Sequence, residues 1–254
     1  GVDLCILMDC TQSMGPYIHA AKETINAVVE DTKRSLLSDG NGQMRVAYVG
    51  YRDFSYDDDR MQAALDSRFI IHPFGTDVSA VRRVIEGGEA DGGGDIPEDV
   101  AGGLQEVNRL QWRPQAPGNG QLNLTIMVAD DPAHGAMYEE EDRTSEASSL
   151  KDKLWMRQAD GTFVQVNNAE YPDAGEELVK LLDKSPYFFF FACKVDQTHK
   201  MHMAFQERID QLPNADELTY EQVELGGCDT NLFRDRVVGS VERARDMLVG
   251  RARG

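Results

Sequence analysis

The chain has 254 residues, which is enough for one α/β domain with a full hydrophobic core. Hydrophobic residues make up 41% of the chain and charged residues 28%, and this balance excludes an intrinsically disordered protein. The formal net charge of −18 makes nucleic acids and anionic membranes poor partners, and an acidic ligand would need a divalent ion to bridge it to the surface.

Strand-like apolar runs alternate with helical patterns along the chain. The strand-like runs cover residues 2–9, 44–52, 68–73, 122–130, 186–195 and 218–225. The helical patterns cover residues 16–36, 77–87, 97–109, 173–184, 198–211 and 230–248. This order predicts an α/β fold with a doubly wound, mostly parallel, six-stranded sheet flanked by helices, and the lack of alternation within the runs predicts burial on both faces. No helix is predicted between the second and third strands, so the third is expected to be an antiparallel edge strand.

One carboxylate and two hydroxyl groups follow the first predicted strand. Asp9, Thr11 and Ser13 stand at alternate positions after the apolar run 4–8. Ligands bind at the carboxyl ends of the strands in open α/β sheets. Oxygen ligands suit Mg²⁺, Mn²⁺ or Ca²⁺, whereas zinc favours Cys and His. By itself, the pattern is also that of a turn followed by a capped helix.

Two later segments add oxygen ligands. A glycine-rich loop carries Asp95, Pro97 and Glu98, and Pro97 predicts the start of a helix. A second apolar strand ends in Asp130 and Asp131. All three segments are expected to meet at one edge of the sheet, where they would form a common site.

Taken together, these segments resemble the von Willebrand factor type A domain, whose fold is Rossmann-like. Asp9, Thr11 and Ser13 match the D-x-S/T-x-S part of its metal-ion-dependent adhesion site. Asp130 stands where that family has the acid after its fourth strand. The resemblance implies Mg²⁺ or Mn²⁺ as the cofactor, with Ca²⁺ also open. It further implies a protein partner whose Asp or Glu carboxylate fills an open coordination position.

The glycine-rich loop departs from most A domains, which offer a threonine there. Asp95-Ile96-Pro97-Glu98 resembles the D-x-P-E of integrin β-subunit I-like domains, in which the Glu reaches the metal. The A domains found with some alpha-kinases are more similar still. They resemble this chain in residues 50–53, 92–104, 130–135 and 201–205.

The resemblance implies a metal site formed by Asp9, Thr11, Ser13, Glu98 and Asp130. Thr11, Ser13 and Glu98 would bind the ion directly. Asp9 and Asp130 would act largely through water or by hydrogen-bonding the residues that bind the ion.

Three further acids are candidates for a supporting role or a secondary ion. Asp95 could cap the following helix or hold a neighbouring ion. Asp131 replaces a more usual small residue and could tighten the site or face solvent. Asp53 could hydrogen-bond a metal ligand, although an ion pair with Arg52 at the strand end is favoured. His134 is expected to stabilise its loop rather than coordinate.

Residues 136–168 are unusually long for a loop in a compact domain and are predicted to be an insertion. Two interpretations stay open for it: an ordered excursion packed on the body, or a lid over the metal face. Apart from this insertion, residues 1–254 are expected to form a single domain. The abrupt start at the first strand suggests a domain cut from a larger protein.

Four cysteines stand at positions 5, 10, 193 and 228 without a C-x-x-C pair. This spacing is not that of a disulfide framework, so a reducing compartment, the cytoplasm, is predicted. No segment has the pattern of a signal peptide or of a membrane span.

The predicted function is that of a metal-dependent protein-binding module, an adhesion or adaptor domain and not an enzyme. One alternative is a Mg²⁺-dependent phosphohydrolase with Asp9 as the nucleophile. That chemistry needs a lysine near the phosphoryl group, and no lysine is expected near the three loops, since the nearest in sequence is Lys22 in the first helix. A second alternative is a purely structural ion, with binding elsewhere.

Overall fold

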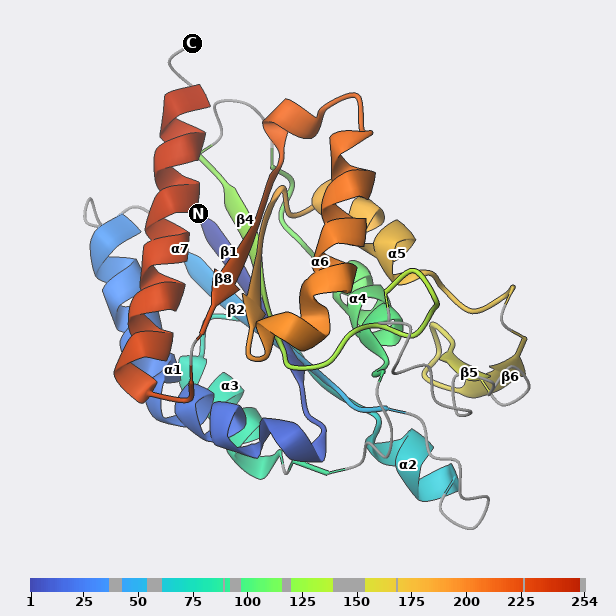
Figure 1. The fold of residues 1–254 in the computed structure, drawn as a ribbon. Coiled ribbons are helices and arrows are strands. Elements are labelled where there is room, and N and C mark those ends of the chain that lie inside the picture. The colour runs from blue at the N-terminus through green and yellow to red at the C-terminus, as the bar shows by residue number, and fades with distance from the viewer. Residues whose placement is uncertain are drawn as a thin grey trace.

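A six-stranded sheet forms the centre of the fold (Figure 1). The computed structural model describes residues 1–36, 43–53, 61–88, 90–91, 97–115, 120–138, 154–167, 169–225 and 227–251. The strands of the sheet are β1 Val2–Asp9, β2 Met44–Tyr51, β3 Phe69–Gly75, β4 Leu122–Ala129, β7 Tyr187–Ala192 and β8 Thr219–Glu224. They follow the order β3-β2-β1-β4-β7-β8, in which β3 runs antiparallel to β2 and the other neighbouring pairs are parallel. The predicted sheet with its antiparallel edge strand is therefore confirmed.

Helices cover both faces of this sheet (Figure 1). One layer consists of α1 Gly15–Leu36, α3 Val78–Gly87 and α7 Thr230–Arg251. The other layer consists of α4 Val100–Arg109, α5 Ala174–Leu182 and α6 Val195–Asp210. Each layer packs on its own group of buried apolar side chains, so the sheet is doubly wound, as predicted.

The phenylalanines of β7 show why the strands carry no alternation in the sequence. Phe189 and Phe191 belong to the core beneath α1 and α7, whereas Phe188 and Phe190 belong to the core beneath α4, α5 and α6. All four are fully buried. Because both faces of the sheet are covered, every position of a central strand is an inward position.

The fold contains a short helix and a hairpin that the sequence did not predict. Helix α2, Met61–Ser67, lies between β2 and β3, so the prediction that no helix joins these strands was wrong. Its seven residues span about two turns, which is too short for an apolar periodicity to stand out. The predicted insertion contains a hairpin of two four-residue strands, β5 Leu154–Arg157 and β6 Phe163–Val166.

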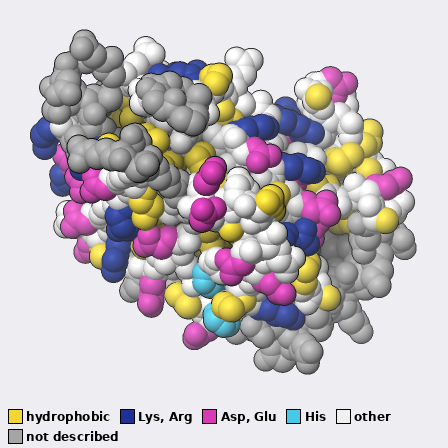
Figure 2. All heavy atoms as spheres, turned by 90° about the horizontal axis from the view of Figure 1, so that it is seen from above, with side chains coloured by type: hydrophobic (Ala, Val, Ile, Leu, Met, Phe, Trp, Pro, Cys, Tyr) yellow, Lys and Arg dark blue, Asp and Glu magenta, His cyan; other side chains and the backbone are white. Residues whose placement is uncertain are grey.

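Charged side chains of both signs lie on the surface. Figure 2 shows Asp and Glu side chains interspersed with Lys and Arg side chains over one face, so the net negative charge is not gathered into a single patch there. Within the part of the chain that the structure describes, no helix is both long and apolar enough to cross a membrane.

Candidate metal centre

Three chain segments meet at the carboxyl ends of the central strands. Asp9 ends β1 and Asp130 follows β4, and these strands are parallel neighbours. The third segment joins them through its backbone, because the amide of Glu98 donates to the carbonyl of Pro132 at 2.9 Å and Glu98 forms a bridge with Ala133. The segments that carry Asp9, Glu98 and Asp130 therefore converge at the predicted edge of the sheet.

The loop that follows β1 holds the Asp9 side chain in place by hydrogen bonds. Oδ1 of Asp9 accepts hydrogen bonds from the amide of Thr11 at 2.8 Å and from the Thr11 hydroxyl at 2.7 Å. The Thr11 hydroxyl lies 3.4 Å from the hydroxyl of Ser13. Asp9 and Thr11 are buried, whereas Ser13 is exposed. The three side chains thus lead from the protein interior to solvent.

Buried carboxylate oxygens without a hydrogen-bond partner mark a place where a cation fits. Among the described residues, Oδ2 of Asp9, Oε2 of Glu98 and Oδ1 of Asp130 are buried and accept no hydrogen bond. Folded proteins rarely leave such atoms unpaired, since each costs about 1–3 kcal/mol. A hard divalent ion would satisfy these oxygens directly or through bound water, with the neighbouring hydroxyls as further ligands. The residues present therefore fit Mg²⁺ or Mn²⁺.

Burial makes the carboxyl groups of Asp9 and Glu98 hold their protons more strongly. It raises the pKa of Asp9 to about 8, although the hydrogen bonds from Thr11 act in the opposite direction. The charges of Asp130 and Asp131 add to the rise. Burial likewise raises the pKa of Glu98 well above its usual value, and the surrounding carboxylates add to it. Without an ion, Asp9 is therefore mostly protonated at neutral pH, and Glu98 keeps its proton to a higher pH than an exposed glutamate does.

Ion binding is expected to release protons, because the ligands must be ionised to hold the ion. The apparent affinity for Mg²⁺ should rise about tenfold per pH unit for each proton released, up to the pKa of Asp9 near 8. In the ion-free domain, by contrast, stability falls as the pH rises. The contribution of Asp9 is complete below its ordinary pKa of 3.8 and is lost as the pH rises through about 8.

Calorimetric titration of Mg²⁺ in PIPES and in Tris, which differ in ionisation enthalpy, measures the number of protons released. A binding heat that is the same in both buffers would show that the ligands are already ionised before the ion arrives.

A tyrosine that the sequence analysis did not single out lies among the carboxylates. Tyr51, the last residue of β2, is fully buried, and its hydroxyl has no hydrogen-bond partner among the described residues. Burial, and then the charges of Asp9, Glu98 and Asp130, raise the pKa of Tyr51. Its hydroxyl is thus a donor available to a carboxylate or to an ion-bound water. An aromatic residue at a strand end carries no functional signal of its own in a sequence.

Lys194 lies beside the site, so the prediction that no lysine is near the three loops was wrong. Its Nζ is 2.6 Å from Oδ2 of Asp130 and 3.6 Å from Oδ2 of Asp131. Asp130 is fully buried, whereas the Lys194 side chain is 39% exposed. Lys194 follows β7, and the pairing of β7 with β4 brings it to Asp130.

The remaining predicted residues lie around this centre or outside the described residues. Asp53 is buried, and its Oδ1 lies 2.7 Å from Nε2 of His134, which gives His134 a partner for the predicted loop-stabilising hydrogen bond. Asp131 is buried next to Lys194 rather than facing solvent. Asp95 lies outside the described residues, so its supporting role stays a prediction.

Helix α4 begins later than Pro97 predicts. Asp99 is its N-cap, and Oδ1 of Asp99 accepts a hydrogen bond from the amide of Gly102 at 2.9 Å. Glu98 therefore precedes the helix instead of standing in its first turn. The backbone bridge to the segment after Asp130, and not the helix, holds Glu98 in place.

Asp99 also connects the site to the predicted insertion. Arg68, which precedes β3, is fully buried and donates from Nε to Oδ2 of Asp99 at 2.9 Å. Arg68 also donates to the carbonyl of Trp155 in β5, and the Tyr171 hydroxyl donates to Oδ1 of Asp99 at 2.5 Å. The β5–β6 hairpin is therefore packed on the body of the domain. Residues 139–153 lie outside the described residues, so the lid interpretation stays open for them.

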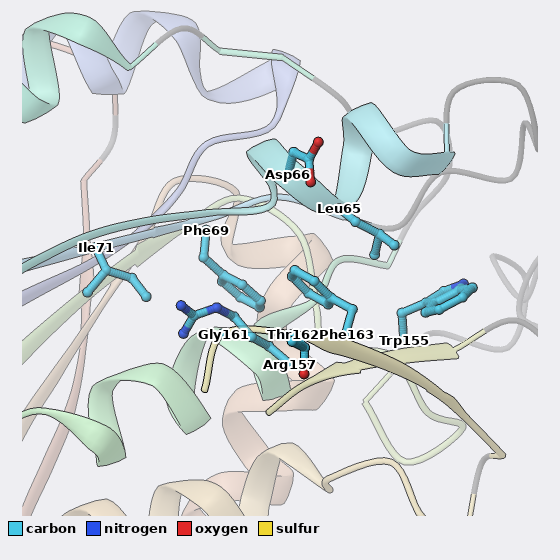
Figure 3. Close-up of a pocket in the computed structure, with 9 residues that line it drawn as sticks. All are labelled: Leu65, Asp66, Phe69, Ile71, Trp155, Arg157, Gly161, Thr162 and Phe163. Carbon is cyan, nitrogen blue, oxygen red and sulfur yellow. The ribbon is translucent and has the colours of Figure 1, made fainter. Parts of the chain in front are cut away.

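The hairpin also forms one wall of a cavity of about 540 Å³ (Figure 3). The rings of Phe69 and Phe163, which both line it, stack with their centroids 6.4 Å apart. Arg157, another lining residue, is engaged by Glu106 at 2.8 Å. None of the predicted metal ligands lines this cavity, so it is separate from the candidate metal centre.

Comparisons with solved structures identify the fold. The vWF domain of the type V pili tip protein Mfa5 from Porphyromonas gingivalis aligns with a TM-score of 0.53 and 10% identity, over 98% of this chain and 95% of that chain. The pilus adhesin SpaC from Lactobacillus rhamnosus GG aligns with a TM-score of 0.54 and 14% identity, over 97% of this chain and 30% of that chain. The chain has the von Willebrand factor type A fold. At these identities the likeness establishes the fold alone.

A sequence relative connects this A domain with an alpha-kinase. Over 137 residues, or 54% of the chain, it is 34% identical to alpha-protein kinase vwkA of Dictyostelium discoideum. The chain covers 19% of that protein, about a fifth of its length. No protein-family model matches the chain. The predicted resemblance to alpha-kinase-associated A domains is confirmed, whereas the kinase activity belongs to the relative.

Proposed function

We propose that this A domain is a protein-binding module in which a divalent ion, Mg²⁺ or Mn²⁺, receives an Asp or Glu carboxylate of a partner. The observation that carries this proposal is the set of buried, unpaired carboxylate oxygens on Asp9, Glu98 and Asp130. When bound, the ion supplies a local positive charge that outweighs the acidity of the domain and attracts an anionic ligand. The same fold in a pilus adhesin and a pili tip protein supports a binding role rather than a catalytic one.

Hydroxyl groups and water complete the proposed coordination. Among the described residues, no group of three or more His, Cys, Asp or Glu side chains is arranged to hold an ion by itself. As the resemblance to A domains implies, Thr11, Ser13 and Glu98 would bind the ion directly, while Asp9 and Asp130 would act largely through water or by hydrogen-bonding the direct ligands. The exposure of Ser13 supports an open coordination position on the solvent side.

The domain is expected to bind peptides that contain Asp or Glu in Mn²⁺ and to lose them in EDTA. The probe is an array of peptides that each carry one acidic residue among neutral ones, matched with copies in which Asn or Gln replaces the acid. Ser13→Ala, which removes a proposed direct ligand, should weaken binding by at least about tenfold. Ser79→Ala changes an exposed serine of α3 and should leave binding unchanged.

Equal binding of the acidic and the amide peptides would contradict carboxylate recognition. Ion binding without any peptide binding would favour the alternative in which the ion is purely structural.

The structure places a lysine where the phosphohydrolase alternative needs one, because Lys194 lies beside Asp130. Its proposed nucleophile is nevertheless poorly placed. Asp9 has no exposed surface, and its Oδ1 is engaged by the amide and the hydroxyl of Thr11. We therefore expect no hydrolysis of p-nitrophenyl phosphate in Mg²⁺ above the rate of Asp9→Asn. Turnover by the unmodified chain that Asp9→Asn abolishes would overturn the binding proposal.

We infer that the domain works as part of a larger protein in the cytoplasm. Its relative vwkA carries the similar region within an alpha-kinase, so other domains of the same protein are candidate partners. All four cysteines are free, and the two in or next to β1, Cys5 and Cys10, are buried. Free thiols are typical of proteins in a reducing compartment.

A further inference from the structure

Lys194 places a positive charge at the site proposed for the divalent ion. Its Nζ lies 2.6 Å from Oδ2 of Asp130, a fully buried carboxylate that is one of the proposed ligands. The same Nζ lies 3.6 Å from Asp131. We propose that Lys194 is a built-in competitor of the divalent ion, whose ammonium group neutralises Asp130 when no ion is bound and thereby lowers the ion affinity. This inference rests on the proposed function.

The position of Lys194 allows its side chain to leave Asp130. Lys194 is the N-cap residue of α6, but its side chain makes no capping hydrogen bond. The side chain is 39% exposed, so the ammonium can reach solvent by rotation of a flexible chain. Lys22, the lysine nearest in sequence to the three loops of the site, donates instead to the carbonyls of Glu86 and Gly88. Lys194 is therefore a cation that can both pair with the site and withdraw from it.

The charges favour a Lys194 that competes with the ion over a Lys194 that only stabilises Asp130. An ammonium and a divalent ion that share one buried carboxylate repel each other strongly, since two positive charges so close together are only partly screened in a buried site. The ion must therefore displace the ammonium or bind against its field. With a neutral side chain at position 194, the ion would meet the undiminished field of Asp130 and Asp131.

Calorimetric titration of Mg²⁺ into three proteins tests the proposal. Lys194→Gln keeps a long polar side chain and removes the charge, and it should bind Mg²⁺ at least tenfold more tightly than the unmodified chain. Lys184→Gln is the matched control, because Lys184 lies at the amino end of β7, where it donates to the carbonyl of Asn108, and the change in net charge is the same. Its affinity should be unchanged. In EDTA, Lys194→Gln should melt below the unmodified chain, because Asp130 has lost its partner.

Lysine labelling in the unmodified chain provides a second measurement that does not depend on a variant. Saturating Mg²⁺ should increase the acetylation of Lys194 by acetic anhydride, read by peptide mass spectrometry, and leave that of Lys184 unchanged.

Equal or weaker Mg²⁺ affinity of Lys194→Gln overturns the proposed competition while leaving the ion site intact, as does unchanged labelling of Lys194 at ion saturation. Absence of Mg²⁺ and Mn²⁺ binding to all three proteins overturns the proposed function together with this inference.

Discussion

Magnesium at one hundred times its dissociation constant is expected to raise the free energy of unfolding of this domain by about 2.7 kcal/mol. The proposed ligands come from three segments that are brought together only by folding, so the unfolded chain should bind the ion weakly. Urea unfolding in EDTA and in Mg²⁺ measures the effect as a shift of the midpoint at constant slope. An unchanged midpoint would count strongly against an ion site in the folded state.

The variant Glu98→Gln distinguishes two ways in which Mg²⁺ could stabilise the domain. The ion could bind at the proposed site, or it could screen the charge repulsion within a chain whose net charge is −18. Glu98 is 2% exposed, and burial raises its pKa well above the usual value, so the neutral amide resembles the protonated acid of the ion-free state. In EDTA the variant should be as stable as the unmodified chain. In Mg²⁺ it should lose most of the 2.7 kcal/mol, because an amide is a much weaker ligand than a carboxylate.

Glu86→Gln is the control for this comparison, since Glu86 lies on the surface of α3, in an exposed ion pair with Arg82. It should respond to Mg²⁺ as the unmodified chain does. A full Mg²⁺ response in Glu98→Gln would show that Glu98 is not a ligand.

The central strands could be predicted from the sequence because burial on both faces leaves uninterrupted apolar runs. The four phenylalanines of β7 are the clearest case, as they divide between two cores. The start of α4 was harder, because Pro97 and Asp99 both signal a helix start and the sequence does not show which one the backbone uses. The hydrogen bond from the amide of Gly102 to Asp99 decides it. Helix α2 was missed because two turns carry too little periodicity.

The candidate metal centre was predictable only where its residues follow strands in recognisable motifs. Asp9 and Asp130 belong to such motifs. Tyr51 and Lys194 do not, and they reach the centre through strand order alone. Ala192 in β7 pairs with Ala129 in β4, so the residue two positions after β7 lies next to the residue one position after β4. A lysine 64 positions away in the sequence can therefore be a direct neighbour in space.

Replacing Arg68 by Met is expected to destabilise the domain by about 3–5 kcal/mol, the largest effect of any substitution considered for this chain. The side chains of Arg68 and Asp99 are 1% and 0% exposed, and their Nη2 and Oδ2 atoms lie 2.5 Å apart. Without the guanidinium, Asp99 would keep a buried charge that the hydroxyl of Tyr171 and the amide of Gly102 only partly compensate. Urea unfolding measures the loss.

A double-mutant cycle tests whether this loss arises from the ion pair rather than from the missing packing of a long side chain. Asp99→Asn keeps a side chain that can cap α4 and removes the charge, so Arg68→Met combined with Asp99→Asn should be destabilised by clearly less than the sum of the two single variants. Arg82→Met breaks the exposed pair with Glu86 and should cost less than about 1 kcal/mol. If Arg68→Met costs no more than Arg82→Met, the buried pair does not hold the hairpin and the start of α4 together.

If the loss of stability is as large as expected, the Mg²⁺ affinity of Arg68→Met should fall as well, because Glu98 immediately precedes Asp99 and depends on its position.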